Sequence, residues 1–148
     1  MKIAVLMGSA NDKEKMAGAV TMLERFGVEV DERVMSAHRN PSEVAAFAGR
    51  ARDDGFGAVI CGAGLAAHLA GVVAAHTTLP VIGVPLSGGI ANGLDALLAT
   101  VQMPKGIPVA TVAVDGSANA GILAVQILAV TDTDLSKKLD EFKAGGAR

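Results

Sequence analysis

The chain has 148 residues, a net charge of −2, and neither tryptophan nor tyrosine. A chain of this length fits one domain, and the absence of a basic cluster and of aromatic residues for base stacking argues against nucleic acid as a partner. No apolar run approaches the roughly 20 residues of a membrane span, and the apolar N-terminus is too short for a signal peptide. We therefore expect one domain over residues 1–148, with no nucleic-acid and no membrane partner.

Small apolar residues are unusually abundant. Hydrophobic residues make up 51% of the chain before its 18 glycines are counted, and together the two groups exceed the ~45–50% that is typical of this residue set. The excess is mostly alanine and glycine, which let helices approach closely, so the composition predicts a homo-oligomer. The one cysteine, Cys61, can form no internal disulfide, which fits a reducing cytoplasm. Its place at the end of an apolar run indicates a buried side chain and not a nucleophile.

Strands and helices are predicted to alternate along the chain. Apolar runs predict strands over about 2–7, 28–35, 56–61, 79–85 and 109–114. Helical spacing predicts helices over about 16–26, 41–54, 65–76, 92–101, 119–130 and 133–143. We interpret every strand as apolar on both faces, which is typical of a parallel sheet covered on both sides. The prediction is a three-layer α/β fold with a flavodoxin-like, five-stranded parallel sheet, commonly of order 2-1-3-4-5, and an extra C-terminal helix.

The polar segment 36–41 stands between the second strand and the second helix. In α/β folds such a loop lies at the carboxyl end of the sheet, where ligands bind. It contains His38, a residue type that can give and take a proton, and Arg39, a permanent cation with a bidentate fork. Pro41 is suited to the first helical turn. The pattern suggests an anionic substrate that Arg39 holds while His38 moves a proton, but an ordinary surface pair in a loop remains an equally open interpretation.

Four loops are expected at the same edge of the sheet. They contribute Gly8, Ser9, Asn11, Asp12, Ser36, His38, Arg39, Ala63, Gly64, His68, Ser87, Gly88 and Gly89. A phosphate would suit a helix N-terminus beside Arg39 and Ser9, and Asp12 could accept hydrogen bonds from ribose hydroxyls. Ordinary turn chemistry would also explain the first loop, His68 could be structural or catalytic, and His76 is expected away from this edge.

Several common sites are absent from the sequence. It contains no G-x-G-x-x-G fingerprint, no Walker loop and no G-x-S-x-G elbow. A glycosidase needs two carboxylates, and this edge offers Asp12 with Asp95 less securely placed. The three histidines lack the spacing of a metal site. The remaining prediction is proton transfer on a phosphorylated small molecule, because the sequence carries no cofactor motif.

Several motifs together resemble one family. They are G-S-x-N-D at 8–12, S-A-H-R-x-P at 36–41, A-G-x-A-A-H-L-x-G at 63–71, L-P-V-I-G-V-P at 79–85, G-L-D-x-L-L at 93–98 and V-Q-M-P-x-G-x-P-V-A-T at 101–111. In order and in spacing, over nearly the whole chain, they resemble the PurE family, the N5-carboxyaminoimidazole ribonucleotide mutases of purine biosynthesis.

The resemblance implies a flavodoxin-like subunit of a cytoplasmic homo-octamer, with active sites at subunit contacts. The family moves a carboxylate from N5 to C4 of aminoimidazole ribonucleotide with neither ATP, metal nor other cofactor, and functional coupling to the ATP-dependent synthetase that forms the carbamate is expected. The resemblance makes His38 the general acid and base. Its implied substrate-binding residues are Ser9, Ser36 and Arg39 for the phosphate, Asp12 for the ribose, Ala63, Gly64, Ala66 and Ala67 around the base and CO2, His68 in support of that loop, and also Asn11 and Leu69.

Four positions depart from the family pattern. Asn11 stands where serine is usual, Lys13 where tryptophan is usual, Leu65 where glycine is usual and Ala70 where proline is usual. The first two alter the phosphate loop and its packing. The last two reshape the pocket around the base.

Two alternatives to the mutase remain open. One is a direct phosphoribosylaminoimidazole carboxylase that uses CO2, and the other is a nucleotide-binding relative without catalysis. His38 followed by Arg39, together with the segment 102–104, favours the mutase branch. The intact His38, Arg39 and Asp12 argue against loss of catalysis.

Overall fold

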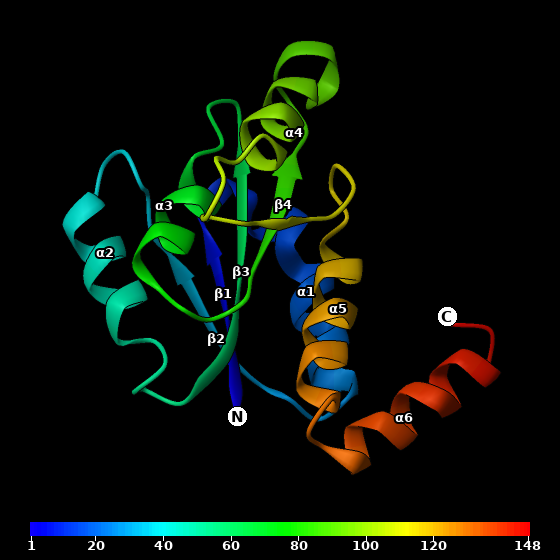
Figure 1. Ribbon diagram of the computed structural model, residues 1–148. Coiled ribbons are helices and arrows are strands. Elements are labelled where there is room, and N and C mark those ends of the chain that lie inside the picture. The colour runs from blue at the N-terminus through cyan, green and yellow to red at the C-terminus, as the bar shows by residue number, and fades with distance from the viewer.

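The computed structural model describes all residues, 1–148, and is built on one parallel sheet (Figure 1). The strands are β1 (Lys2–Met7), β2 (Glu29–Val34), β3 (Phe56–Gly64), β4 (Val81–Leu86) and β5 (Ala110–Thr111). Their order is β2-β1-β3-β4-β5, and every neighbouring pair is parallel. The predicted flavodoxin-like order is therefore confirmed.

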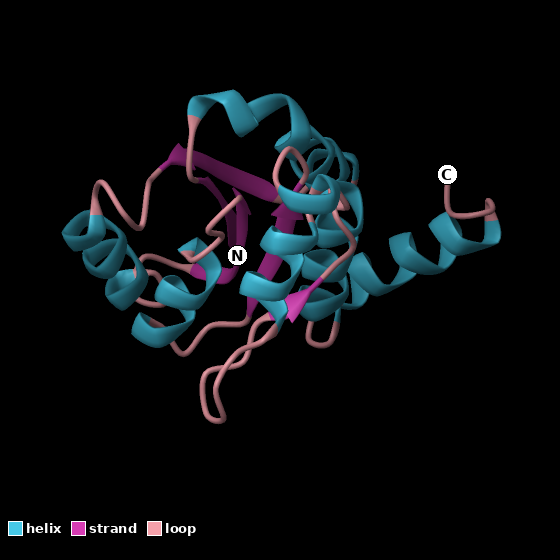
Figure 2. Ribbon diagram, turned by 90° about the horizontal axis from the view of Figure 1, so that it is seen from above, coloured by secondary structure: helices cyan, strands magenta, loops and turns pink.

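Helices cover both faces of this sheet. The α-helices are α1 (Lys13–Arg25), α2 (Pro41–Arg50), α3 (Leu69–His76), α4 (Leu94–Val101), α5 (Ser117–Ala129) and α6 (Thr133–Ala144), with short 3-10 turns η1 (Ala10–Asp12) and η2 (Ile90–Asn92). Helices α1 and α5 lie on one side and α2 and α3 on the other (Figure 1), and the view from above in Figure 2 shows the strands between the helices. The three-layer architecture is confirmed. None of the helices has the length and apolar character needed to cross a membrane.

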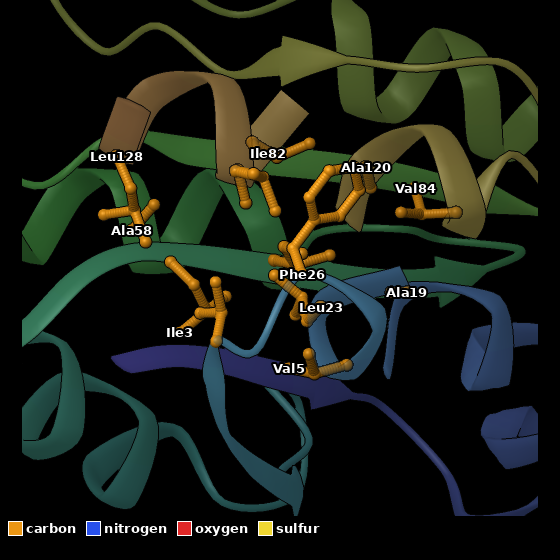
Figure 3. Close-up of a cluster of buried hydrophobic side chains, with 14 of the residues drawn as sticks. Ile3, Val5, Ala19, Leu23, Phe26, Ala58, Ile82, Val84, Ala120 and Leu128 are labelled. Atoms are coloured by element: carbon orange, nitrogen blue, oxygen red, sulfur yellow. The ribbon is translucent and has the colours of Figure 1, made fainter. Parts of the chain in front are cut away.

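Alternation along the central strands builds the two halves of the core. Ile3 and Val5 of β1 point to the side of α1 and α5, whereas Ala4 and Leu6 point to the side of α2 and α3, and all four are fully buried. Figure 3 shows the first half, where side chains of β1, β3 and β4 meet those of α1 and α5. This rigid sheet holds the loops at its carboxyl edge.

Helices α1 and α5 approach each other through small residues. A Cβ atom built on Gly121 of α5 would lie 2.8 Å from the carbonyl oxygen of Ala19 in α1 and 3.1 Å from the Cβ of Met22. Glycine is therefore required where the two backbones meet. Part of the abundant alanine and glycine thus serves packing inside the subunit, in addition to any interface between subunits.

The prediction that every strand is apolar on both faces is wrong for the two edge strands. In β2 the side chains of Glu29, Glu32, Arg33 and Val34 are exposed, and Arg33 pairs with Asp31 at 2.7 Å. Strand β5 is only two residues long. An edge strand has one neighbour and meets solvent along its other side, so it need not be continuously apolar.

Several element boundaries differ from the predicted ones, and three of them lie in the segment that leads to the carboxyl edge of the sheet through β3. Helix α2 ends at residue 50 instead of 54, and the chain turns through Gly55 at φ +84°. Strand β3 is three residues longer than predicted and ends at Gly64. Helix α3 begins at Leu69 instead of residue 65, because Leu65 adopts a left-handed backbone with φ +53° that a right-handed helix cannot contain. Residues 65–68 are therefore a loop at the carboxyl edge of the sheet.

The predicted extra C-terminal helix, α6, leads away from the sheet (Figure 1). It is attached by one apolar face, on which Leu135, Leu139 and Phe142 are buried. Phe142 meets Phe26 edge to face, with 5.4 Å between ring centroids, and Lys138 donates a hydrogen bond to the Phe26 carbonyl oxygen at 2.8 Å. This helix lies far from the carboxyl edge of the sheet and contributes no residue to the cleft there.

Candidate active site

The carboxyl ends of β1 to β4 open into a cleft of about 470 Å³. Its lining comes from the four loops that the topology was expected to bring together. The lining residues are Gly8, Ser9, Asp12, Ser36, Ala37, His38, Arg39, Ala63, Gly64, Leu65, Ala66, His68, Leu69, Ser87 and Gly88.

The first loop presents a carboxylate to the cleft. The Ser9 hydroxyl oxygen accepts a hydrogen bond from the backbone N–H of Asn11 at 3.2 Å and so caps the turn that leads into α1. Asp12 follows, partly buried. Burial raises the pKa of its carboxyl group, while a backbone hydrogen bond with Ser9 and the nearby ammonium of Lys15 oppose that rise. A half-buried acceptor of this kind suits hydroxyl groups of a ligand.

The second loop presents His38 and Arg39 at the tip of a tight turn. The Ser36 hydroxyl oxygen accepts from the Arg39 backbone N–H at 3.2 Å, and the Ser36 carbonyl oxygen accepts from Asn40 at 2.8 Å. Pro41 then occupies the first turn of α2, as predicted. The Arg39 guanidinium is exposed and has no hydrogen bond or ion pair within the chain. It is a cation available to a ligand, and a bidentate fork suits a phosphate.

The two histidines of the cleft contact each other. Nε2 of His38 lies 2.8 Å from Nδ1 of His68, with the rings nearly perpendicular at 87°. One of these nitrogens donates and the other accepts, so the pair holds a proton between the two rings. No carboxylate bonds to either ring, and both side chains are exposed to the cleft. This arrangement allows His38 to give or take a proton while His68 provides the matching partner.

The third loop supplies small walls and one strained residue. Ala63, Gly64 and Ala66 leave open space at the end of β3. Leu65, between them, is 62% exposed and in the left-handed conformation that L-residues with branched side chains rarely adopt. Its side chain therefore lies at the mouth of the cleft. This is the position at which leucine in place of the usual glycine was expected to change the shape of the pocket.

Most of the candidate residues come together, and three do not. Gly89 follows Ser87 and Gly88 but lies outside the lining. Asn11 is exposed on η1 outside the lining, and Ala67 is 1% exposed because the turn from Leu65 directs its side chain into the core. Ala37 and Leu65 line the cleft without having been among the candidates. Ala37 had a signal, since it lies inside the motif at 36–41. Leu65 had one as well, because it stands where glycine is usual, and glycine is the residue that most readily adopts a positive φ.

Other chemistry-bearing residues lie outside the cleft. His76 is exposed at the end of α3, as expected. Cys61 is buried, as predicted, and burial raises the pKa of its thiol far above the ordinary range. Asp95 accepts a hydrogen bond from the adjacent Ala96 N–H at 2.8 Å and does not line the cleft. No group of three or more histidine, cysteine, aspartate or glutamate side chains is placed to hold a metal ion.

Known proteins resemble this chain over nearly its full length. It is 50% identical over 141 residues to the N5-carboxyaminoimidazole ribonucleotide mutase of Saccharolobus solfataricus. The aligned residues are 95% of this chain and 89% of that protein. The N5-carboxyaminoimidazole ribonucleotide mutase of Bacillus subtilis is 49% identical over 141 residues, which are 94% of this chain and 87% of that protein. The phosphoribosylaminoimidazole carboxylase of Candida glabrata is 49% identical over 140 residues, which are 95% of this chain but 25% of that larger protein.

The structural and family comparisons agree with the sequence comparison. The crystal structure of Treponema denticola PurE matches with a TM-score of 0.89 at 26% identity, over 98% of this chain and 90% of that one. The family model described as AIR carboxylase matches residues 2–148. With its flavodoxin-like sheet and its cleft of histidine, arginine and aspartate side chains, the chain belongs to the AIR carboxylase family.

Proposed function

We propose that this chain is an N5-carboxyaminoimidazole ribonucleotide mutase, which moves a carboxylate from N5 to C4 of aminoimidazole ribonucleotide in purine biosynthesis. The mutases among its relatives align with almost all of both chains, which supports residues 1–148 acting as one domain of this kind. The observation that carries the chemistry is the 2.8 Å contact between His38 and His68, in a cleft that also holds an unpaired Arg39. That combination suits proton transfer on an anionic substrate.

The cleft offers complementary groups to each part of the nucleotide. The Arg39 guanidinium and the hydroxyls of Ser9 and Ser36 are available to the 5′-phosphate. Asp12, on the loop next to Ser9, accepts hydrogen bonds from the ribose hydroxyls. With both ends of the ribose phosphate fixed, the aminoimidazole ring lies between the histidine pair and the small residues after β3.

His38 acts twice on the bound substrate. It first protonates the N5 carbamate nitrogen, the N5–C bond breaks, and CO2 is released into the cleft. The ring, now an enamine-like nucleophile, attacks CO2 through C4. His38 then takes the proton that C4 still carries, which restores the aromatic ring and returns His38 to its starting state. No net proton is gained or lost, so one histidine with a partner suffices.

The walls of the cleft keep the released CO2 close to C4. Ala63, Gly64 and Ala66 offer backbone and methyl surface without large side chains. A trapped molecule reacts at a high effective concentration, whereas CO2 that escapes must be recaptured from solution. Confinement and one proton carrier are the two contributions that the protein makes.

Paired turnover assays test this function against the direct carboxylase, because some relatives bear the carboxylase name. One assay supplies N5-carboxyaminoimidazole ribonucleotide, and the other supplies aminoimidazole ribonucleotide with bicarbonate. We expect rapid conversion in the first assay and slow conversion in the second. Preference for the second pair would assign the chain to the carboxylase branch, and no turnover in either would indicate a nucleotide-binding relative without catalysis.

We further propose that the subunits form a homo-octamer with the clefts at subunit contacts. Support comes from α4, where Leu94, Leu98 and Val101 are 45%, 47% and 47% exposed. Their spacing of four and three within one helix places them along one stripe. Ile90, on the preceding turn η2, is 73% exposed as well. A group of exposed apolar side chains of this kind is typical of an interaction site.

The assembly predicts a mass near eight times the 14.9 kDa of one subunit by light scattering. Replacing Leu94 and Leu98 together with glutamate is expected to shift that mass to smaller species, because charged side chains would have to be buried in the contact. A wild-type monomer would contradict the octamer.

The cellular setting follows from the reaction. We place the enzyme in the cytoplasm, where purine precursors are made and where the buried thiol of Cys61 stays reduced. The carbamate substrate is labile, so functional coupling to the ATP-dependent synthetase that forms it would limit its loss. Comparing flux with the two enzymes mixed and with the carbamate added from solution tests this coupling.

A further inference from the structure

A network of hydrogen bonds outside the cleft converges on one residue of its wall, Ser87. The ammonium of Lys15, in the first turn of α1, donates to the Ser87 carbonyl oxygen at 2.7 Å and to the Ser87 hydroxyl oxygen at 2.9 Å. From the other side, the backbone N–H of Ser87 donates to Oδ1 of Asp115 at 2.9 Å. Three hydrogen bonds from two distant segments therefore hold this residue.

Both of the residues that hold Ser87 are fixed in turn. The hydroxyl of Ser117, which is 4% exposed, donates to the Lys15 carbonyl oxygen at 2.6 Å. The Asp115 backbone N–H donates to the Pro85 carbonyl oxygen at 2.9 Å. Asp115 also has φ +56°, a left-handed conformation that aspartate adopts more readily than most non-glycine residues. The network thus connects α1, the end of β4 and the turn before α5.

The segment after Ser87 has little conformational restraint of its own. Gly88 and Gly93 have φ +116° and +117°, and Ala91 and Asn92 between them also have positive φ. Glycine gives a backbone wide freedom, so a segment that begins with two glycines does not fix its own position. The wall of the cleft at Ser87 is therefore held by the end of β4, which is paired to β3 up to Leu86, and by the bonds from Lys15 and Asp115.

We propose that Lys15 is a positioning residue for the mutase reaction: through Ser87 it holds the β4 wall of the cleft at a fixed separation from the loop that carries His38 and Arg39. The proposal rests on the proposed function. Strands β1 and β3 lie between these two walls in the sheet, so neither wall touches the other and each needs its own support. Lys15 does not line the cleft, and it acts on the substrate only through the residue that it holds.

The charge of Lys15 supports the same role. Its ammonium opposes the rise that burial causes in the pKa of Asp12, and so favours the ionised carboxylate that accepts ribose hydroxyls. The same ammonium faces Asp115 across Ser87. Lys15 therefore lies between two carboxylates while it donates to a neutral residue.

Three variants test the proposal by steady-state kinetics. Lys15→Met keeps the length of the side chain and removes its donors, Lys15→Arg keeps charge and donors, and Lys13→Met removes the same charge two residues away. Lys13 pairs with Glu32 at 3.1 Å on the surface and does not contact Ser87, which makes it the matched control. Lys15→Met removes both charge-assisted hydrogen bonds to Ser87. We expect it to raise KM at least about tenfold, with kcat within about twofold. Lys15→Arg restores most of the loss, and Lys13→Met resembles the wild type.

Hydrogen exchange at the Ser87 amide provides a readout that does not depend on turnover. We expect faster exchange in Lys15→Met than in the wild type, Lys13→Met or Lys15→Arg, because the wall loosens around its bond to Asp115. Lys15 is exposed, so its replacement should leave the fold intact. Ser87→Ala removes the hydroxyl oxygen, one of the two Ser87 atoms that accept from Lys15. It should raise KM by a smaller factor than Lys15→Met.

The outcomes separate the two proposals. An unchanged KM in Lys15→Met, or an equal rise in Lys13→Met, would overturn the positioning role. Unchanged exchange at Ser87 would overturn it as well. If the wild type shows no turnover, the proposed function fails, and calorimetric binding of aminoimidazole ribonucleotide to the same variants then decides whether Lys15 supports the cleft.

Discussion

Replacing His38 with asparagine is expected to lower kcat by about 10²–10⁴-fold, the range that a positioned proton carrier contributes. Asparagine has a similar shape and can still form a hydrogen bond to His68, but it cannot accept and return a proton at neutral pH. Because Arg39, Ser9 and Asp12 stay in place, KM should change by less than about tenfold. The measurement is steady-state turnover of N5-carboxyaminoimidazole ribonucleotide by both proteins.

His76→Asn is the matched control for this substitution. His76 is exposed at the end of α3 and outside the cleft, so the same chemical change there should leave kcat and KM unaltered. His68→Asn should lie between the two variants, since it removes the partner of His38 but leaves the proton carrier itself. Full activity of His38→Asn would remove His38 from the reaction, and equal losses in all three variants would point to a general effect of histidine replacement.

The central part of the fold could be predicted because its strands are continuously apolar. β1, β3 and β4 are buried on both faces, and that pattern has few solutions other than a covered parallel sheet. The edge strands could not be predicted equally well. Four of the six side chains of β2 are charged, and β5 pairs with β4 over only two residues, so neither carries the full apolar signal.

The members of the candidate site could be predicted more readily than the contacts among them. A parallel sheet collects its loops at one edge, so Ser9, His38 and Arg39 were expected to meet there. The contact between His38 and His68 joins loops that follow β2 and β3, which β1 separates in the sheet, and no local pattern encodes it. The same holds for Lys15 and Ser87, which are 72 residues apart.

The backbone conformation of the segment after β3 also could not be predicted from the helix propensity of the sequence. The segment after β3 contains leucine and alanine, which favour a helix, and the expected helix began there. In the structure Leu65 turns the chain with φ +53°, and the helix starts four residues later. The left-handed turn is imposed by the surroundings at the cleft, which local propensity does not describe.

The contact between α1 and α5 should be among the least tolerant places in the subunit. Gly121→Ala adds a Cβ atom that would lie 2.8 Å from the Ala19 carbonyl oxygen, a backbone atom that can move only if the two helices separate. Overpacking of this kind costs about 1–3 kcal/mol, and the better helix propensity of alanine offsets up to about 1 kcal/mol. We therefore expect a net loss of about 1–2 kcal/mol in the free energy of unfolding, and about 3 kcal/mol for Gly121→Val.

Gly49→Ala provides the opposite case within the same protein. Gly49 is exposed in the last turn of α2, and its added Cβ would meet only the His76 carbonyl oxygen, at 3.9 Å. This variant should gain up to about 1 kcal/mol from helix propensity alone. Urea unfolding of the three variants, at one protein concentration so that any association contributes equally, measures the differences in the free energy of unfolding. Equal stabilities of the two alanine variants would mean that α1 and α5 can separate without cost, and that the small residues between them are not needed for their packing.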